Sequence, residues 1–203
     1  MNIEIVTDML DPVKPLIPLN IAGIKYLVLH HIEADSASWQ DINQWHKENG
    51  WNCGGYNEYI KKDGTIIIMR GDNIGAQTLN MNSISYGIAL EGNFNNHIIM
   101  PPDQYNSLME RINYNLKRFP SSVLTVPHRE LVPTECPGKF FPLVKILSDI
   151  NTNDLELAAA LAILKTANVI NTVNYWQINS KNGSIVKGEY ARQLILNMAN
   201  SLK

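Results

Sequence analysis

Apolar and polar positions alternate along the first part of the chain in a way that predicts several short strands. Residues 25–31 form an apolar run of the length of a buried strand, and residues 85–90 form another. Within residues 56–70, two β-prone runs flank Asp63-Gly64, which favours a β-hairpin. A further short strand is expected at 123–126. We expect these runs to pair into a sheet.

Two helices are predicted between these strands. The sequence Ser-Trp-Gln-Asp at 38–41 resembles a capping box, and Gly50 is a natural stop, so a helix is expected over about 38–49. A second helix begins near Pro101, where apolar residues start to recur at helical spacing, namely Tyr105, Leu108, Ile112 and Leu116. Strands and helices therefore follow one another along the chain as far as the last predicted strand.

The pattern changes after Pro142. A polar break with a good helix cap lies at 151–154, and residues 155–170 are rich in Ala and Leu and read as a helix. A later helical stripe consists of Tyr190, Leu194 and Met198. We therefore expect two domains, 1–148 and 149–203. A module of about 50 residues buries only a small core, so we expect it to pack on the first domain or on a second copy.

Charge and hydropathy narrow the range of partners. The 203 residues carry a formal net charge of −2, which gives no electrostatic reason to expect nucleic-acid binding. No apolar run reaches the roughly 18 residues that a membrane span needs, so membrane insertion is not expected. Residues 1–5 lack a basic lead-in and an apolar block. We therefore expect synthesis in the cytoplasm without a signal peptide, and release by another agent if the protein acts outside the cell.

Candidate metal ligands occur in two distant places. His30 and His31 end the first predicted strand, and His128 is followed by Cys136 in a Pro-Gly turn. Zinc favours His and Cys ligands, and three of them leave a fourth position for water. The residues alone leave alternatives open, because a single His is often structural and a Cys is often a small buried apolar residue. A disulfide between Cys53 and Cys136 would consume the thiolate that a metal needs.

Taken together, six segments resemble the zinc-dependent N-acetylmuramoyl-L-alanine amidases, which include phage lysozyme-amidases and animal peptidoglycan recognition proteins. The resemblance covers roughly residues 25–145 in the family's order, and its segments are 29–31, 55–56, 60–64, 87–92, His128 and 134–138. It implies an α/β fold in which helices flank a central mixed β-sheet. The residues beyond it resemble the small helical modules appended to phage and prophage lysins.

The resemblance also implies which residues bind zinc. By position, His30, His128 and Cys136 correspond to the family's Zn²⁺ ligands. His31 then falls to packing or hydrogen bonding. Two neutral imidazoles and one thiolate would leave the ion with a net positive charge, which lowers the pKa of a bound water toward about 7.

Three further residues are candidates for catalysis. Tyr56 matches the family's catalytic tyrosine, whose protonated phenol can donate a hydrogen bond to an oxyanion. Thr134 occupies a position where some members carry lysine, and its hydroxyl can donate but cannot supply charge. Glu91 is a candidate general base or ligand-orienting group, and the alternative is that it only ends a strand. Glu58 stands where the family usually has an apolar residue, which puts the lining of the pocket in doubt.

The function that the resemblance implies is hydrolysis of the amide bond between N-acetylmuramic acid and L-alanine in peptidoglycan, by a phage or prophage endolysin. The C-terminal helices are expected to bind cell wall or to form a homo-oligomer through Tyr175 and Trp176. One alternative is a noncatalytic peptidoglycan-binding module, although such relatives typically lose a metal ligand. Another is a cysteine hydrolase that uses Cys136 or Cys53 with a histidine.

Overall fold

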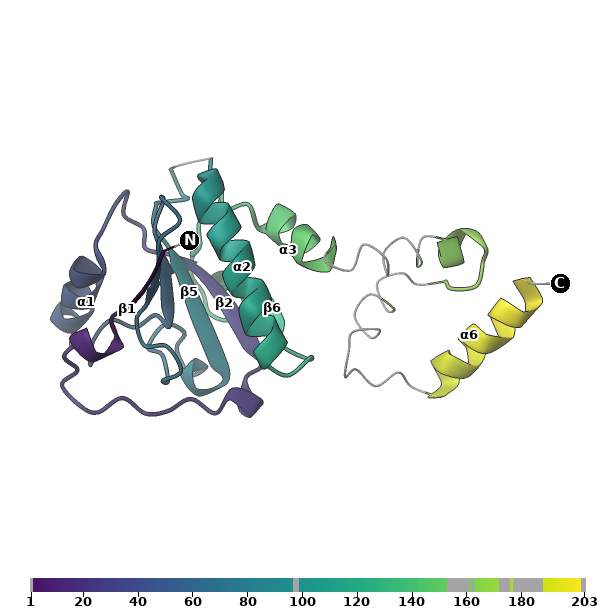
Figure 1. The fold of residues 1–203 in the computed structure, drawn as a ribbon, viewed down its shortest axis with the longest axis horizontal. Coiled ribbons are helices and arrows are strands. Elements are labelled where there is room, and N and C mark those ends of the chain that lie inside the picture. The colour runs from purple at the N-terminus through teal and green to yellow at the C-terminus, as the bar shows by residue number, and fades with distance from the viewer. Residues whose placement is uncertain are drawn as a thin grey trace. The chain divides into compact units, whose positions relative to one another are not determined.

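In the computed structural model, the strands of the described residues form one mixed β-sheet (Figure 1). Their order across the sheet is β1-β4-β3-β5-β2-β6. Only β3 and β4 pair in antiparallel fashion, and the other neighbours are parallel. The strands are β1 (Ile3–Ile5), β2 (Tyr26–His31), β3 (Glu58–Ile60), β4 (Ile66–Ile68), β5 (Ser85–Leu90) and β6 (Leu124–Pro127). The predicted mixed α/β fold is confirmed.

The predicted hairpin and helices are present in the same region. β3 and β4 form the hairpin, and Gly64 in its turn has a φ of +82°, which favours glycine. Helix α1 (Trp39–Glu48) begins with the predicted capping box. Asp41 N donates to Ser38 Oγ at 3.1 Å, and Ser38 N donates to the Asp41 carboxylate at 2.7 Å. Helix α2 (Pro102–Arg118) begins at the second of the two prolines.

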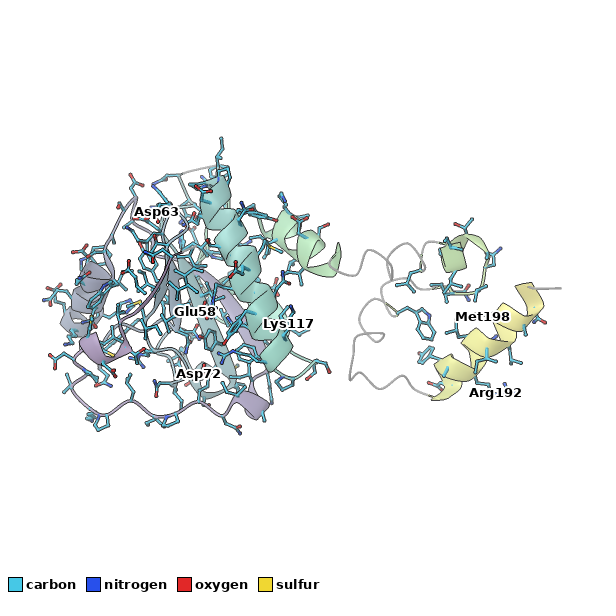
Figure 2. All side chains as sticks on the ribbon, in the orientation of Figure 1. Glu58, Asp63, Asp72, Lys117, Arg192 and Met198 are labelled. Atoms are coloured by element: carbon cyan, nitrogen blue, oxygen red, sulfur yellow. The ribbon has the colours of Figure 1, made fainter. Side chains whose placement is uncertain are left out.

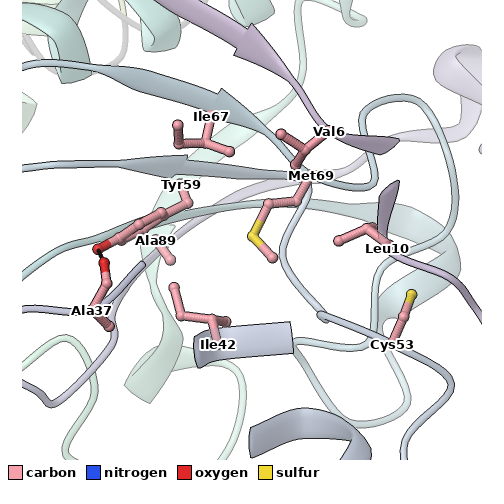
Figure 3. Packing of buried hydrophobic residues seen from close by; sticks show 9 residues of the cluster. All are labelled: Val6, Leu10, Ala37, Ile42, Cys53, Tyr59, Ile67, Met69 and Ala89. Carbon is pink, nitrogen blue, oxygen red and sulfur yellow. Dashed lines mark hydrogen bonds between the residues drawn. The ribbon is translucent and has the colours of Figure 1, made fainter. Parts of the chain in front are cut away.

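Successive residues of a strand point to opposite faces of the sheet, and α1 and α2 pack on these two faces. On one face, Tyr59 of β3 packs in a buried cluster with Ile42 of α1, and its hydroxyl donates to Ala37 O at 2.8 Å (Figure 3). On the other face, the neighbouring Glu58 binds Arg111 of α2. The apolar core that supports α1 consists of Val6, Leu10, Ala37, Ile42, Cys53, Tyr59, Ile67, Met69 and Ala89.

The structure describes residues 2–96, 99–152, 161, 163–171, 176 and 188–201. The chain divides into two compact units, Met1–Val144 and Lys145–Lys203. Helix α3 (Leu143–Thr152) spans this division. Helix α6 (Gly188–Ser201) carries the predicted stripe of Tyr190, Leu194 and Met198. No helix in the described ranges combines the length and hydropathy that crossing a membrane requires.

The second unit has a small apolar cluster of its own. Leu161, Val169, Ile170 and Trp176 are buried together, and Leu194 packs against them. The predicted polar break at 151–154 is partly helical, because residues 151 and 152 end α3. Its remaining residues 153–154, much of the predicted helix at 155–170, and Tyr175 lie outside the described residues. The division into functional domains 1–148 and 149–203 therefore stays a prediction.

Candidate metal centre and active site

The sheet brings the two histidine segments together at one edge. His30 and His31 end β2, and His128 directly follows β6, the parallel neighbour of β2. Carboxyl ends of parallel strands meet at the same edge of a sheet, where α/β proteins usually bind ligands. The ring centroids of His30 and His128 are accordingly 4.4 Å apart.

The turn after His128 returns Cys136 to the same place. Cys136 Sγ lies 3.6 Å from His30 Nδ1 and 3.9 Å from His31 O. The turn is held by Arg129 N, which donates to Cys136 O at 3.0 Å. One potential ligand atom from each of His30, His128 and Cys136 lies within 4.8 Å of the others. Both cysteines are free thiols, so the disulfide considered from the sequence is absent.

The electrostatics of these three groups suit a metal cation. Burial, and then the neighbouring His128, lower the pKa of His30 well below its usual value, and burial also lowers the pKa of His128. Both rings are therefore neutral near pH 7, the form that binds a metal. Burial raises the pKa of the Cys136 thiol to about 12, and a bound cation would favour its thiolate. Two imidazoles and one thiolate fit the ligand preferences of zinc.

His31 points away from this cluster, as strand alternation requires. Its Nδ1 accepts a hydrogen bond from Phe94 N at 3.1 Å, and its ring stacks on Phe94. Burial lowers its pKa to about 4, which keeps the ring a neutral acceptor. The tandem histidines thus have different surroundings, and His31 makes the packing and hydrogen-bonding contacts expected of it.

The ring of Tyr56 lies between two histidines. Its centroid is 5.3 Å from that of His30 and 5.3 Å from that of His46. Burial and the nearby Cys136 raise the pKa of Tyr56, so its phenol stays protonated and can donate a hydrogen bond. His46 Nδ1 accepts from Gly55 N at 2.8 Å, which supports the backbone just before Tyr56. Nothing in the sequence indicated this contact of His46.

The other two candidate catalytic residues have different settings. Thr134 is exposed, and its Oγ1 accepts a hydrogen bond from Cys136 N at 3.2 Å, which leaves the hydroxyl hydrogen for another acceptor. Glu91 is buried and accepts three hydrogen bonds, from Ser36 Oγ, Ala37 N and Lys62 N. None of these three donors is a candidate metal ligand. The general-base role of Glu91 stays a prediction.

Two buried side chains were missed or misread from the sequence. Gln77 Oε1 lies 2.6 Å from His30 Nε2, although nothing in the local sequence around Gln77 indicates a site. Glu58, labelled in Figure 2, was expected to alter the pocket lining. It instead faces α2, where Arg111 Nε and Nη2 donate to its carboxylate at 2.8 Å each. The doubt about the pocket was wrong because Glu58 lies on the opposite face of the sheet from Tyr59.

Known proteins are similar to the first unit in sequence and in fold. The model of the family described as N-acetylmuramoyl-L-alanine amidase matches residues 20–139. The endolysin of Enterobacteria phage K11 is 32% identical over 104 residues, covering 49% of this chain and 68% of the endolysin.

Solved structures extend this similarity to three dimensions. The N-acetylmuramoyl-L-alanine amidase LysC from Clostridium intestinale URNW has a TM-score of 0.67 and 31% identity, covering 74% of this chain and 98% of LysC. A variant of Drosophila PGRP-LB in complex with tracheal cytotoxin has a TM-score of 0.61 and 25% identity, covering 68% of this chain and 89% of the other. The span matched by the family model contains His30, His128 and Cys136.

Proposed function

Because this chain belongs to the N-acetylmuramoyl-L-alanine amidase family, we propose that it is a zinc-dependent endolysin that cleaves the bond between N-acetylmuramic acid and L-alanine in peptidoglycan. Amidase activity follows from the family and from its endolysin relatives. Zinc dependence is supported by one observation, the convergence of His30, His128 and Cys136 from two distant segments of the chain. A noncatalytic binding module would have no need of this complete set.

We assign the three convergent side chains to metal binding and the neighbouring groups to the substrate. Zinc, when bound, would polarise the scissile carbonyl and lower the pKa of a water toward about 7. Tyr56 would donate a hydrogen bond from its phenol to the oxyanion that develops from this carbonyl. Thr134, at the exposed side of the same turn as Cys136, would add a second hydroxyl donor.

The leaving amine must also receive a proton. Glu91 is buried, and its two carboxylate oxygens already accept three hydrogen bonds from the chain. We therefore favour a solvent water over Glu91 as the immediate donor to the amine.

Peptidoglycan is the partner that these relatives support. The Drosophila relative was solved with tracheal cytotoxin. Peptidoglycan recognition protein-LE was solved with the same compound, which is a monomeric diaminopimelic acid-type peptidoglycan. The phage endolysins among the relatives support action of this chain on the bacterial cell wall. We propose that residues 149–203 bind the wall, with self-association as the alternative role.

The assignment of ligands is tested by removing each in turn. His30→Ala, His128→Ala and Cys136→Ala should each abolish zinc binding and release of stem peptides together, because three donors define the site. Metal content is measured on the purified proteins, and digests of purified peptidoglycan are analysed by mass spectrometry for peptides that begin with alanine. Cys53→Ala is the control, since Cys53 lies in the core under α1, and it should keep both properties.

The outcomes also separate the alternatives. Full turnover by a demonstrably metal-free variant would remove the zinc mechanism. Two results together would favour a cysteine hydrolase. Covalent labelling of Cys136 would abolish activity, and zinc would not restore the activity that is lost after chelation. Binding of peptidoglycan without release of any stem peptide would favour a noncatalytic module.

A further inference from the structure

A buried glutamine contacts the imidazole of His30 on the side away from Cys136. Gln77 Oε1 lies 2.6 Å from His30 Nε2, whereas the other ring nitrogen, Nδ1, lies 3.6 Å from Cys136 Sγ. His30 and Gln77 are 1% and 7% exposed, so water does not compete freely for this contact. The two nitrogens of one ring thus face an amide on one side and the candidate metal ligands on the other.

The position of Gln77 is set by its own neighbours. Its Nε2 donates to Ser85 Oγ at 2.8 Å, and Thr78 Oγ1 donates to its Oε1. Asn82 Oδ1 accepts from the backbone N–H groups of Gln77 and Thr78 at 2.9 Å each. In this arrangement the amide turns Oε1 toward the His30 ring and its NH₂ group toward Ser85.

Gly87 of β5 provides the space for this side chain. A Cβ atom at Gly87 would lie 2.6 Å from Gln77 Cδ, closer than real Cβ contacts allow. The lack of a side chain at Gly87, in the middle of a buried strand, therefore makes room for Gln77. It lets Gln77 reach across the sheet to β2, where Val28 pairs with Gly87 two residues before His30.

We propose that Gln77 is a positioning residue that holds His30 in the tautomer protonated at Nε2, so that Nδ1 carries the lone pair for the metal. A neutral imidazole has one N–H and one acceptor nitrogen, and the partner of the N–H decides which nitrogen is free to bind. Gln77 Oε1 is an acceptor, so Nε2 is the donor. This inference rests on the proposed zinc dependence and adds that the metal binds Nδ1 of His30 and not Nε2.

The first test reads the tautomer directly in the zinc-loaded, full-length protein. Long-range proton–nitrogen NMR of ¹⁵N-labelled histidine distinguishes protonation at Nε2 from protonation at Nδ1. We expect His30 to be protonated at Nε2. Its NMR signal is identified as the one that is missing from the spectrum of His30→Ala. Protonation at Nδ1 would overturn the proposal, and this measurement requires no variant at Gln77.

The second test compares variants by zinc affinity, measured by competition with a chromogenic chelator. Gln77→Leu should weaken zinc binding about 10- to 100-fold, the usual effect of losing a group that orients a ligand. Gln77→Glu keeps an acceptor at the same distance and should match or exceed the wild-type affinity. Gly87→Ala should weaken binding in the same direction as Gln77→Leu, because its methyl group displaces the amide.

A matched control separates positioning from general destabilisation. Gln104 is another buried glutamine, whose amide donates to Ile60 O and Glu91 O, and Gln104→Leu should lower stability but leave zinc affinity unchanged. Wild-type affinity in a folded Gln77→Leu protein, or a Gln77→Glu protein as weak as Gln77→Leu, would overturn the proposal. Failure of the wild type itself to bind zinc would instead overturn the proposed function.

Discussion

The rings of Tyr56, His30 and His46 show how single residues prepare this site. Each ring is neutral near pH 7, because burial lowers the pKa of both histidines and raises that of the tyrosine. His46 accepts a hydrogen bond from the backbone just before Tyr56, and the ring of His30 lies 5.3 Å from that of Tyr56. The phenol is thus held beside the candidate ligands with its proton in place.

Tyr56→Phe isolates the contribution of this proton. The variant keeps the ring contacts and removes one hydrogen-bond donor, so kcat for peptidoglycan should fall about 100- to 1000-fold, the usual loss for one oxyanion donor. Zinc affinity and thermal stability, measured in parallel, should stay at the wild-type values. A Phe variant with unchanged kcat would show that another group, with Thr134 the first to examine, stabilises the oxyanion.

At the scale of elements, β3 contacts the helices on both faces of the sheet because its successive residues point to opposite faces. Tyr59 supports the core under α1, while Glu58 forms a buried ion pair with Arg111 of α2. Tyr86 Oη and Asn115 Nδ2 also donate to Glu58, at 2.8 and 3.0 Å. The carboxylate therefore ties two strands to α2, on the face away from the ligands.

Removing the cation of this pair should destabilise the protein without affecting its chemistry. Arg111→Met leaves the buried charge of Glu58 with only neutral donors, which should cost about 3–5 kcal/mol of unfolding free energy. Urea unfolding measures this loss, and Lys117→Met, at an exposed position on the same helix, is the control. A loss no larger than that of the control would show that Tyr86 and Asn115 suffice to hold the carboxylate.

At the scale of the whole molecule, the candidate site lies within one of two compact units. All three candidate ligands, together with Tyr56 and Gln77, belong to Met1–Val144. The second unit has its own small apolar cluster around Trp176, and α6 exposes apolar residues such as Ile195. This separation makes the roles of the two units testable by truncation.

A protein of residues 1–152, which retains all of α3, should keep its zinc affinity and release stem peptides from sonicated peptidoglycan at the wild-type rate. If the second unit binds the wall, the truncated protein should sediment less with intact cell walls than the full chain does. Equal sedimentation would remove the proposed targeting role. Sedimentation velocity of both proteins tests self-association, which predicts a larger species only for the full chain.

Local patterns in the sequence were enough to predict most elements of the first unit. The capping box at Ser38 and the turn glycine Gly64 act within four residues, so they can be read without a fold. The resemblance to the family predicted a cluster of His30, His128 and Cys136, and the structure brings these residues together. Family motifs supplied this pairing, since no local rule connects residues so far apart in the chain.

Tertiary structure alone decided which atoms face one another. The loop between β4 and β5 places Gln77, 47 residues after His30, against one ring nitrogen, and the returning turn places Cys136, 106 residues after His30, against the other. Alternation of side chains along β3 turns Glu58 away from the site. The sequence by itself determined the elements and the donor types, because these depend on neighbouring residues. Orientation depends on packing between distant segments, and it becomes defined only when the sheet has formed.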